Sequence, residues 1–182
     1  GLLSVVVFDE TRDATYIDET ELDAVVAGLP RAERDQFHAD LELARWGDAC
    51  SDEDRVDLGR LEGRPSWGAE ELMDEEVGRR IREGLAAGDK VCVRVPVHVE
   101  EKSGELDEWS YFDVLFASTE ESKAPPAFYR EGLRISEVGS SKISGIRSIV
   151  VIDDPPLARM LGDAEGPAHV NWKPSTRRFK DK

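Results

Sequence analysis

The sequence predicts an α+β domain with a mostly antiparallel sheet of four to five strands and helices packed on one face of that sheet. Residues 69–87 carry an apolar stripe with helical spacing. Apolar and polar residues then alternate over 91–100, and they alternate again over 110–117. A helical stripe followed by two alternating runs, with a short polar turn between them, indicates a helix that precedes an antiparallel hairpin.

The first part of the chain predicts one leading strand and two helices. Residues 3–8 form a short apolar run that ends at acidic residues, which is typical of a strand. Residues 22–29 and 30–45 each place apolar side chains at helical spacing. Pro30 separates the two because proline cannot continue a preceding helix.

The third predicted helix, 69–87, has the clearest pattern in the chain. Ser66 provides a capping side chain before it, and Gly88 provides the flexible residue that often ends a helix. We expect its apolar stripe to face the core. The stripe consists of Leu72, Met73, Val77, Ile81 and Leu85.

The two alternating runs predict a hairpin with its turn at 102–105. Pro96 lacks a backbone donor, so we expect the first of these strands to lie at an edge or to contain a bulge. The pattern after the hairpin predicts further strands at 129–138 and 146–152.

Residues 155–164 predict a short helix that begins at two prolines. The shift from helical to strand patterns predicts two subdomains, a helical one at 1–88 with one leading strand and a strand-rich one at 89–182.

The charge of the chain argues against direct binding of nucleic acid. The 182 residues include 39 Asp and Glu against 24 Lys and Arg, which gives a net charge of −15. Binding to DNA or RNA depends on neutralising phosphates with basic side chains. The basic residues near the C-terminus are interpreted as a solvated tail.

The cysteines and the hydropathy predict a cytoplasmic protein. Cys50 and Cys92 are far apart in the sequence and fit no metal-binding spacing, which favours free thiols in a reducing compartment. No run of about 18 apolar residues is present, so the sequence predicts no membrane contact.

Four residues near the end of the chain allow a catalytic interpretation and a structural one. Asp153 and Asp154 follow an apolar strand, and Glu165 and His169 follow the next helix. These side chains can bind a metal or act in acid–base chemistry, so one hypothesis is a small metal- or phosphate-dependent enzyme. The structural alternative, which the pattern favours, is that the aspartates cap the helix while Glu165 and His169 fix a turn.

Lys142 is the candidate for contacting a phosphate. It lies in a connection of serine and glycine residues, 139–145, where a long cationic side chain can extend toward a ligand. The spacing of a P-loop is absent, and an ordinary exposed lysine is the alternative.

Three segments in the second half of the chain carry a family resemblance. They are Phe-Tyr-Arg-Glu-Gly-Leu-Arg-Ile at 128–135, the strand at 148–154, and Leu-Gly-Asp-Ala-Glu-Gly-Pro-Ala-His at 161–169 followed by Trp172. The stretch that contains them resembles the region downstream of the ATP-binding module in bacterial proteins of the GHKL superfamily, which includes ATPases like Hsp90, gyrase B, MutL and histidine kinases. The resemblance covers somewhat under half of the chain.

The resemblance implies a transducer domain with a fold like the second domain of ribosomal protein S5. Such a domain relays the nucleotide state of the neighbouring ATP-binding domain to a partner, and Lys142 takes the role of the lysine that reaches the γ-phosphate. ATP and Mg²⁺ are then expected in the full-length parent protein, with no cofactor bound by this chain.

The motifs of the nucleotide pocket itself are missing. That superfamily binds ATP with an Asn/Glu helix and an Asp-x-Gly-x-Gly turn, and the segment 57–61, Asp-Leu-Gly-Arg-Leu, lacks the second glycine. We therefore expect a non-catalytic portion of a longer protein, with the pocket located before Gly1. The remaining alternatives are the small enzyme described above and an acidic protein-interaction domain.

Overall fold

The chain forms two compact units, Gly1–Glu42 and Leu43–Lys182. The computed structural model describes residues 5–8, 14–17, 26–60, 73–100, 107–120, 125–135, 138, 143–165 and 172. The division differs from the predicted subdomains 1–88 and 89–182. It falls within helix α2 (Arg31–Asp48), while helix α3 (Glu75–Ala87) packs on the sheet of the second unit.

The first unit contains a small antiparallel hairpin and the beginning of α2. Strand β1 (Val5–Phe8) confirms the predicted leading strand, and it pairs with β2 (Ala14–Ile17), which was not predicted. Helix α2 confirms the helix expected at 30–45. Of the helix expected at 22–29, residues 22–25 lie outside the described residues, and Val26 and Ala27 are helical.

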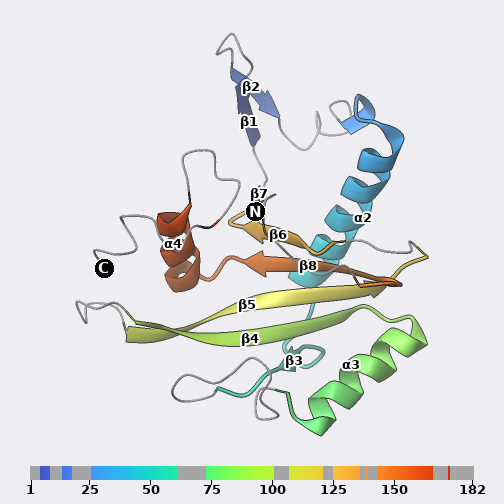
Figure 1. The fold of residues 1–182 in the computed structure, drawn as a ribbon, viewed down its shortest axis with the longest axis vertical. Helices are drawn as coiled ribbons and strands as arrows, with labels where there is room; N and C mark the ends of the chain where they lie inside the picture. Colours follow the sequence, from blue (N-terminus) through green and yellow to red (C-terminus); the bar gives the residue numbers. More distant parts are fainter. Residues whose placement is uncertain are drawn as a thin grey trace. The chain divides into compact units, whose positions relative to one another are not determined.

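The second unit contains a six-stranded mixed sheet, which confirms the α+β class (Figure 1). The strands lie in the order β3-β4-β5-β8-β6-β7. Their bounds are β3 Val56–Asp57, β4 Val91–Glu100, β5 Asp107–Ser118, β6 Ala127–Arg130, β7 Leu133–Ile135 and β8 Ile146–Ile152. The pairs β4–β5, β5–β8 and β6–β7 are antiparallel, whereas β3–β4 and β6–β8 are parallel. The sheet is mostly antiparallel, as predicted, but it has six strands.

One cause of the larger strand count is a tight turn inside the strand expected at 129–138. Arg130 and Leu133 pair with each other, so Glu131 and Gly132 form a two-residue hairpin turn. Both turn residues have positive φ, 47° and 79°. This is the requirement of the type I′ turn, whose twist matches that of the flanking strands. The expected single strand is therefore two, β6 and β7.

Helices cover both faces of the sheet, which corrects the prediction of helices on one face. Near one end of the sheet, Val91, Val93 and Val95 of β4 pack against an apolar stripe of α3, which consists of Val77, Ile81 and Leu85. Helix α4 (Pro155–Ala164) packs on the same face around Val99, and Figure 1 shows α3 and α4 at opposite ends of β4 and β5.

The other face of the sheet is covered by the end of α2. Leu43 lies there in one buried cluster with Cys92, Leu115 and Ile149. Side chains alternate between the two faces along each strand. Because both faces of this sheet carry apolar side chains, each face needs a helix to shield it from water.

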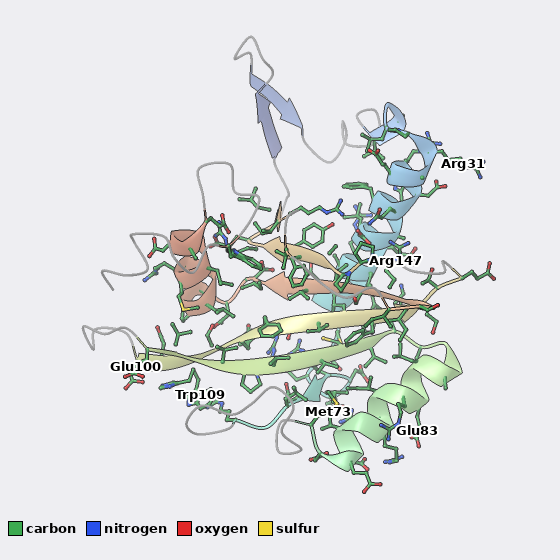
Figure 2. All side chains as sticks on the ribbon, viewed as in Figure 1. Arg31, Met73, Glu83, Glu100, Trp109 and Arg147 are labelled. Carbon is green, nitrogen blue, oxygen red and sulfur yellow. The ribbon has the colours of Figure 1, made fainter. Side chains whose placement is uncertain are left out.

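Helix α3 begins later than expected. Asp74 caps it, because its Oδ1 accepts a hydrogen bond of 2.7 Å from the backbone N–H of Val77. Gly88 ends the helix with φ 83°, as predicted. Met73 precedes the cap and is 50% exposed, so it does not belong to the core stripe (Figure 2). Ser66 and Leu72 lie outside the described residues.

No helix in the described part of the chain is both long and apolar enough to cross a membrane.

Candidate functional site

The residues proposed from the sequence lie around the two ends of α4. Asp153 and Asp154 connect β8 to the first turn of α4, and Glu165 directly follows the helix. Lys142 and His169 lie outside the described residues.

Asp154 attaches the start of α4 to β5. The hydroxyl of Ser110 donates a hydrogen bond of 2.6 Å to Asp154 Oδ2 and accepts one of 3.2 Å from the backbone N–H of Leu157. Asp154 occupies the N-cap position, but its own side chain caps no backbone group. A neighbouring strand therefore provides the capping oxygen, and Asp154 orients it.

Glu165 forms a buried ion pair with Arg130 of β6. Arg130 donates from Nε to Oε1 at 2.5 Å and from Nη2 to Oε2 at 2.9 Å, which is a bidentate geometry. The side chains are 8% and 0% exposed. Arg130 Nη1 pairs with Glu131, and the carboxylates raise the pKa of Arg130 above its ordinary value. The guanidinium is therefore always charged, and Glu165 is its counter-ion.

Trp172 closes this arrangement from the C-terminal side. Its indole N–H donates to Glu165 Oε1 at 3.1 Å, and its ring meets Phe128 edge-on with centroids 6.0 Å apart. A β-bridge also joins Glu165 and Trp172. Gly162 leaves room for the guanidinium, because a Cβ there would lie 3.3 Å from Arg130 Nη1. We call Phe128, Arg130, Gly162, Glu165 and Trp172 the Arg130 cluster.

The predicted metal ligands do not converge in the described residues. Asp154 bonds to Ser110, Glu165 bonds to Arg130, and Asp153 lies beside a cavity described below. Among the residues that the structure describes, no group of three or more His, Cys, Asp or Glu side chains is placed to hold a metal ion.

A half-open cavity of about 210 Å³ lies on the face of the sheet that α2 covers. Its polar lining consists of Asp48, Arg55, Arg94, Tyr111, Asp113 and Asp153. Gly47, Leu115 and Val151 complete it. The end of α2 approaches the sheet closely here, since a Cβ on Gly47 would lie 2.2 Å from Leu115 Cδ1. We call this space the Arg94 cavity.

The strand register brings the charges of the cavity together. Arg94 of β4 pairs across the hairpin with Asp113 of β5, and its guanidinium donates from Nε and Nη2 to the two carboxylate oxygens, each at 2.8 Å. The guanidinium also lies 3.7 Å from the ring centroid of Tyr111, two residues along β5. The hydrogen bonds to Asp113 raise the pKa of Arg94 above its ordinary value.

Arg55 reaches the cavity because of the short strand β3. Val56 pairs in parallel with Val93, which brings Arg55 close to Arg94. Its side chain is only 10% exposed, Nη1 pairs with Asp52 at 2.6 Å, and Nη2 donates to the carbonyl of Cys50 at 3.4 Å. The buried Nε has no hydrogen-bond partner among the described residues.

Asp153 lies beside the cavity with part of its surface in solvent. Partial burial raises the pKa of its carboxyl, and the nearby carboxylates of Asp48, Glu131 and Asp113 add to the shift. The cavity thus combines two guanidinium groups with carboxylates, an arrangement suited to binding a charged ligand. The sequence did not single out Arg55, Arg94 or Asp113.

Comparison of the chain with protein-family models, with curated proteins and with solved structures finds no match.

Proposed function

We propose that this chain contains the transducer-like portion of a GHKL-type ATP-binding protein and relays nucleotide state from a neighbouring ATP-binding domain to a partner. The observation that carries the proposal is the Arg130 cluster. Phe128 and Arg130 come from the first quoted motif, and Gly162, Glu165 and Trp172 come from the last one. These residues meet in one buried contact.

The chemistry of the cluster favours a structural role over a catalytic one. The ion pair is shielded from solvent, and all three nitrogens of the guanidinium have carboxylate partners. A buried charge pair of this kind is strongly destabilised when one partner is lost. It therefore links β6 to the end of α4, while Ser110 and Asp154 link β5 to the start. A helix fixed at both ends can transmit a displacement to the sheet.

Lys142 takes the role of the phosphate sensor in this proposal. It belongs to the connection between β7 and β8, and the end of that connection is anchored by a hydrogen bond of 3.0 Å from the N–H of Thr119 to the carbonyl of Gly145. An ammonium group on a flexible stem can meet the γ-phosphate of a nucleotide held by the neighbouring domain. ATP and Mg²⁺ belong to that domain in the proposal.

The setting of this function is proposed to be cytoplasmic. Cys50 and Cys92 are both free thiols in the structure, and Cys92 is buried. Burial raises the pKa of the Cys92 thiol to about 12, so it stays protonated and unreactive near neutral pH.

The test uses the full-length parent protein. Replacement of Lys142 by Ala is expected to lower the ATP turnover number by about tenfold or more, as loss of one preorganised charge at a transferring group does. Lys142→Arg keeps the charge and should retain more turnover. Lys102→Ala, in the connection between β4 and β5, is the matched control and should behave as wild type. A parent that does not hydrolyse ATP, or an unchanged Lys142→Ala variant, would contradict the proposal.

A metal titration separates this proposal from the small-enzyme alternative. If the carboxylates near α4 have structural roles, Mg²⁺, Mn²⁺ and Zn²⁺ should leave the thermal unfolding midpoint of the 182-residue chain unchanged. A saturable rise of several degrees with one of these ions, abolished by Asp154→Asn, would favour the metal-dependent enzyme instead.

A further inference from the structure

The Arg94 cavity has no part in the coupling function proposed above, although two arginines and three aspartates line it. Arg55 and Arg94 lie close enough for each positive charge to oppose the other. Each has one carboxylate partner, Asp52 and Asp113 respectively. A guanidinium has five N–H donors, so a single carboxylate leaves part of each group available to a further acceptor.

The N–H groups that remain available on the two arginines can be identified. Asp113 accepts from Nε and Nη2 of Arg94, and Nη1 has no hydrogen-bond partner among the described residues. In Arg55, Nη1 is taken by Asp52 at 2.6 Å, Nη2 makes only a long hydrogen bond of 3.4 Å, and Nε has no partner among the described residues. Its side chain is nine-tenths buried, so solvent does not compensate for that weak bond. An anionic group in the cavity would supply the acceptor that both arginines lack.

Among the described residues, Asp48 and Asp153 lack a cationic partner, just as the two arginines lack a further acceptor. Both carboxylates line the cavity, and neither forms an ion pair within the described part of the chain. Asp48 also lies at the last residue of α2, where the helix carbonyls add partial negative charge. A cationic group placed here would be attracted by both side chains and by the helix end.

A ligand with a single charge does not satisfy both requirements. A simple anion would face Asp48 and Asp153 in addition to the net charge of −15, and a simple cation would face the two arginines. The volume of about 210 Å³ also limits the size of the ligand. Pockets for drug-sized molecules typically measure roughly 300–1,000 Å³.

We propose that the Arg94 cavity binds a small zwitterion of the free amino acid type. The guanidinium groups of Arg55 and Arg94 hold its carboxylate, and Asp48 and Asp153 hold its ammonium group. Leu115 and Val151 offer an apolar surface to a short side chain. The stacking of Arg94 on Tyr111 and its bidentate bond to Asp113 fix the guanidinium before the ligand arrives, which lowers the entropic cost of binding.

The test is calorimetric titration of the 182-residue chain with the free L-amino acids and γ-aminobutyrate. At least one is expected to bind saturably. Its N-acetyl derivative lacks the positive charge and its methyl ester lacks the negative one. Each is expected to bind at least about tenfold more weakly, which corresponds to the loss of one well-placed charge contact. No binding by any of these probes would overturn the proposal.

Equal binding of a blocked derivative would also overturn the proposal, because it would show a site for one charge only. Asp153→Asn is the preferred variant. Its side chain reaches solvent and makes no ion pair in the described residues, so the variant is expected to fold. We expect it to weaken binding several-fold. Asp35→Asn, an exposed carboxylate on α2, is the control and should bind as wild type.

Discussion

Arg94 and Arg130 lie on opposite faces of the sheet. They differ in exposure and in carboxylate partners, and this difference assigns Arg130 a structural role and Arg94 a binding role. Arg130 is 8% exposed, and each of its guanidinium nitrogens meets a carboxylate. Arg94 is 25% exposed, and its one carboxylate partner takes two of the three nitrogens. The first arrangement leaves nothing for a ligand, whereas the second leaves a donor at the edge of a cavity.

Replacement of Glu165 by Gln is the sharpest test of the Arg130 cluster. The substitution keeps the shape but removes the charge that neutralises a guanidinium with 8% exposure. Loss of one partner from a buried pair typically costs about 3–5 kcal/mol, so we expect the free energy of unfolding to fall by about 3 kcal/mol. Chemical denaturation measures this. Glu76→Gln removes a carboxylate from an exposed pair with Arg79 and is the control. Similar losses in both variants would argue against a special role for the cluster.

The raised pKa of Asp153 predicts a pH dependence of stability. Its folded-state pKa lies above the ordinary value of 3.8, so the folded chain holds this proton more tightly than the unfolded chain does. Stability from this group is therefore present below the ordinary pKa and is lost as pH rises through the folded-state pKa. The Asp153→Asn variant cannot ionise at this position. As pH rises from the ordinary pKa through the folded-state pKa, its melting temperature should therefore increase relative to that of the wild type. A constant difference between the two proteins would contradict the shift.

The sequence pointed to side chains at the ends of α4, but it did not point to the side chains that line the Arg94 cavity. Asp154 was expected to cap α4, but its side chain caps no backbone group and instead accepts a hydrogen bond from Ser110, which provides the capping oxygen. Glu165 was expected to fix a turn, and its carboxylate bonds to Arg130. The cavity was missed because its residues are dispersed in the sequence. One signal was present. The hairpin turn expected at 102–105 has its centre between Ser103 and Gly104, and strand residues equally distant from that centre pair with each other. Arg94 and Asp113 are such a pair.

The scale of the secondary-structure elements explains which parts of the fold were predictable. The long strands β4 and β5 and the stripe of α3 repeat a period over many residues, so their faces were found correctly, except at Met73, which precedes the helix. Strand β3 has two residues and carries no period at all. It exists because of its parallel pairing with β4, which is a long-range contact. The cover of the second face by α2 is equally non-local.

The turn between β6 and β7 gives a prediction at this scale. Gly132 has φ 79°, a conformation in which a Cβ is strained by about 1–2 kcal/mol. We expect Gly132→Ala to lower the free energy of unfolding by about 1 kcal/mol, as measured by urea denaturation. Gly59→Ala is the matched control, because an added Cβ there would meet no atom within 4 Å. Equal effects at the two glycines would show that the turn geometry has little energetic weight.

At the scale of the whole molecule, the buried core that the described residues form lies in the second unit. The three buried clusters among these residues consist of residues from Leu43 onward. We therefore expect a variant without residues 1–25 to retain a cooperative thermal transition with a midpoint close to that of the full chain. Circular dichroism at 222 nm follows α2, α3 and α4 through the transition. Loss of the transition would show that the core of the second unit requires the hairpin of the first.

Both borders of the six-stranded sheet are brief, with two residues in β3 and three in β7. Strand β3 covers only part of its neighbour, because it pairs with Val93 and Arg94 alone, and the outer side of β4 from Val95 to Glu100 has no strand partner within the described residues. Unpaired backbone groups of this kind can bond to a further strand from another chain. Pro96 lies in this stretch and lacks a backbone donor, which weakens the pairing of any strand added there.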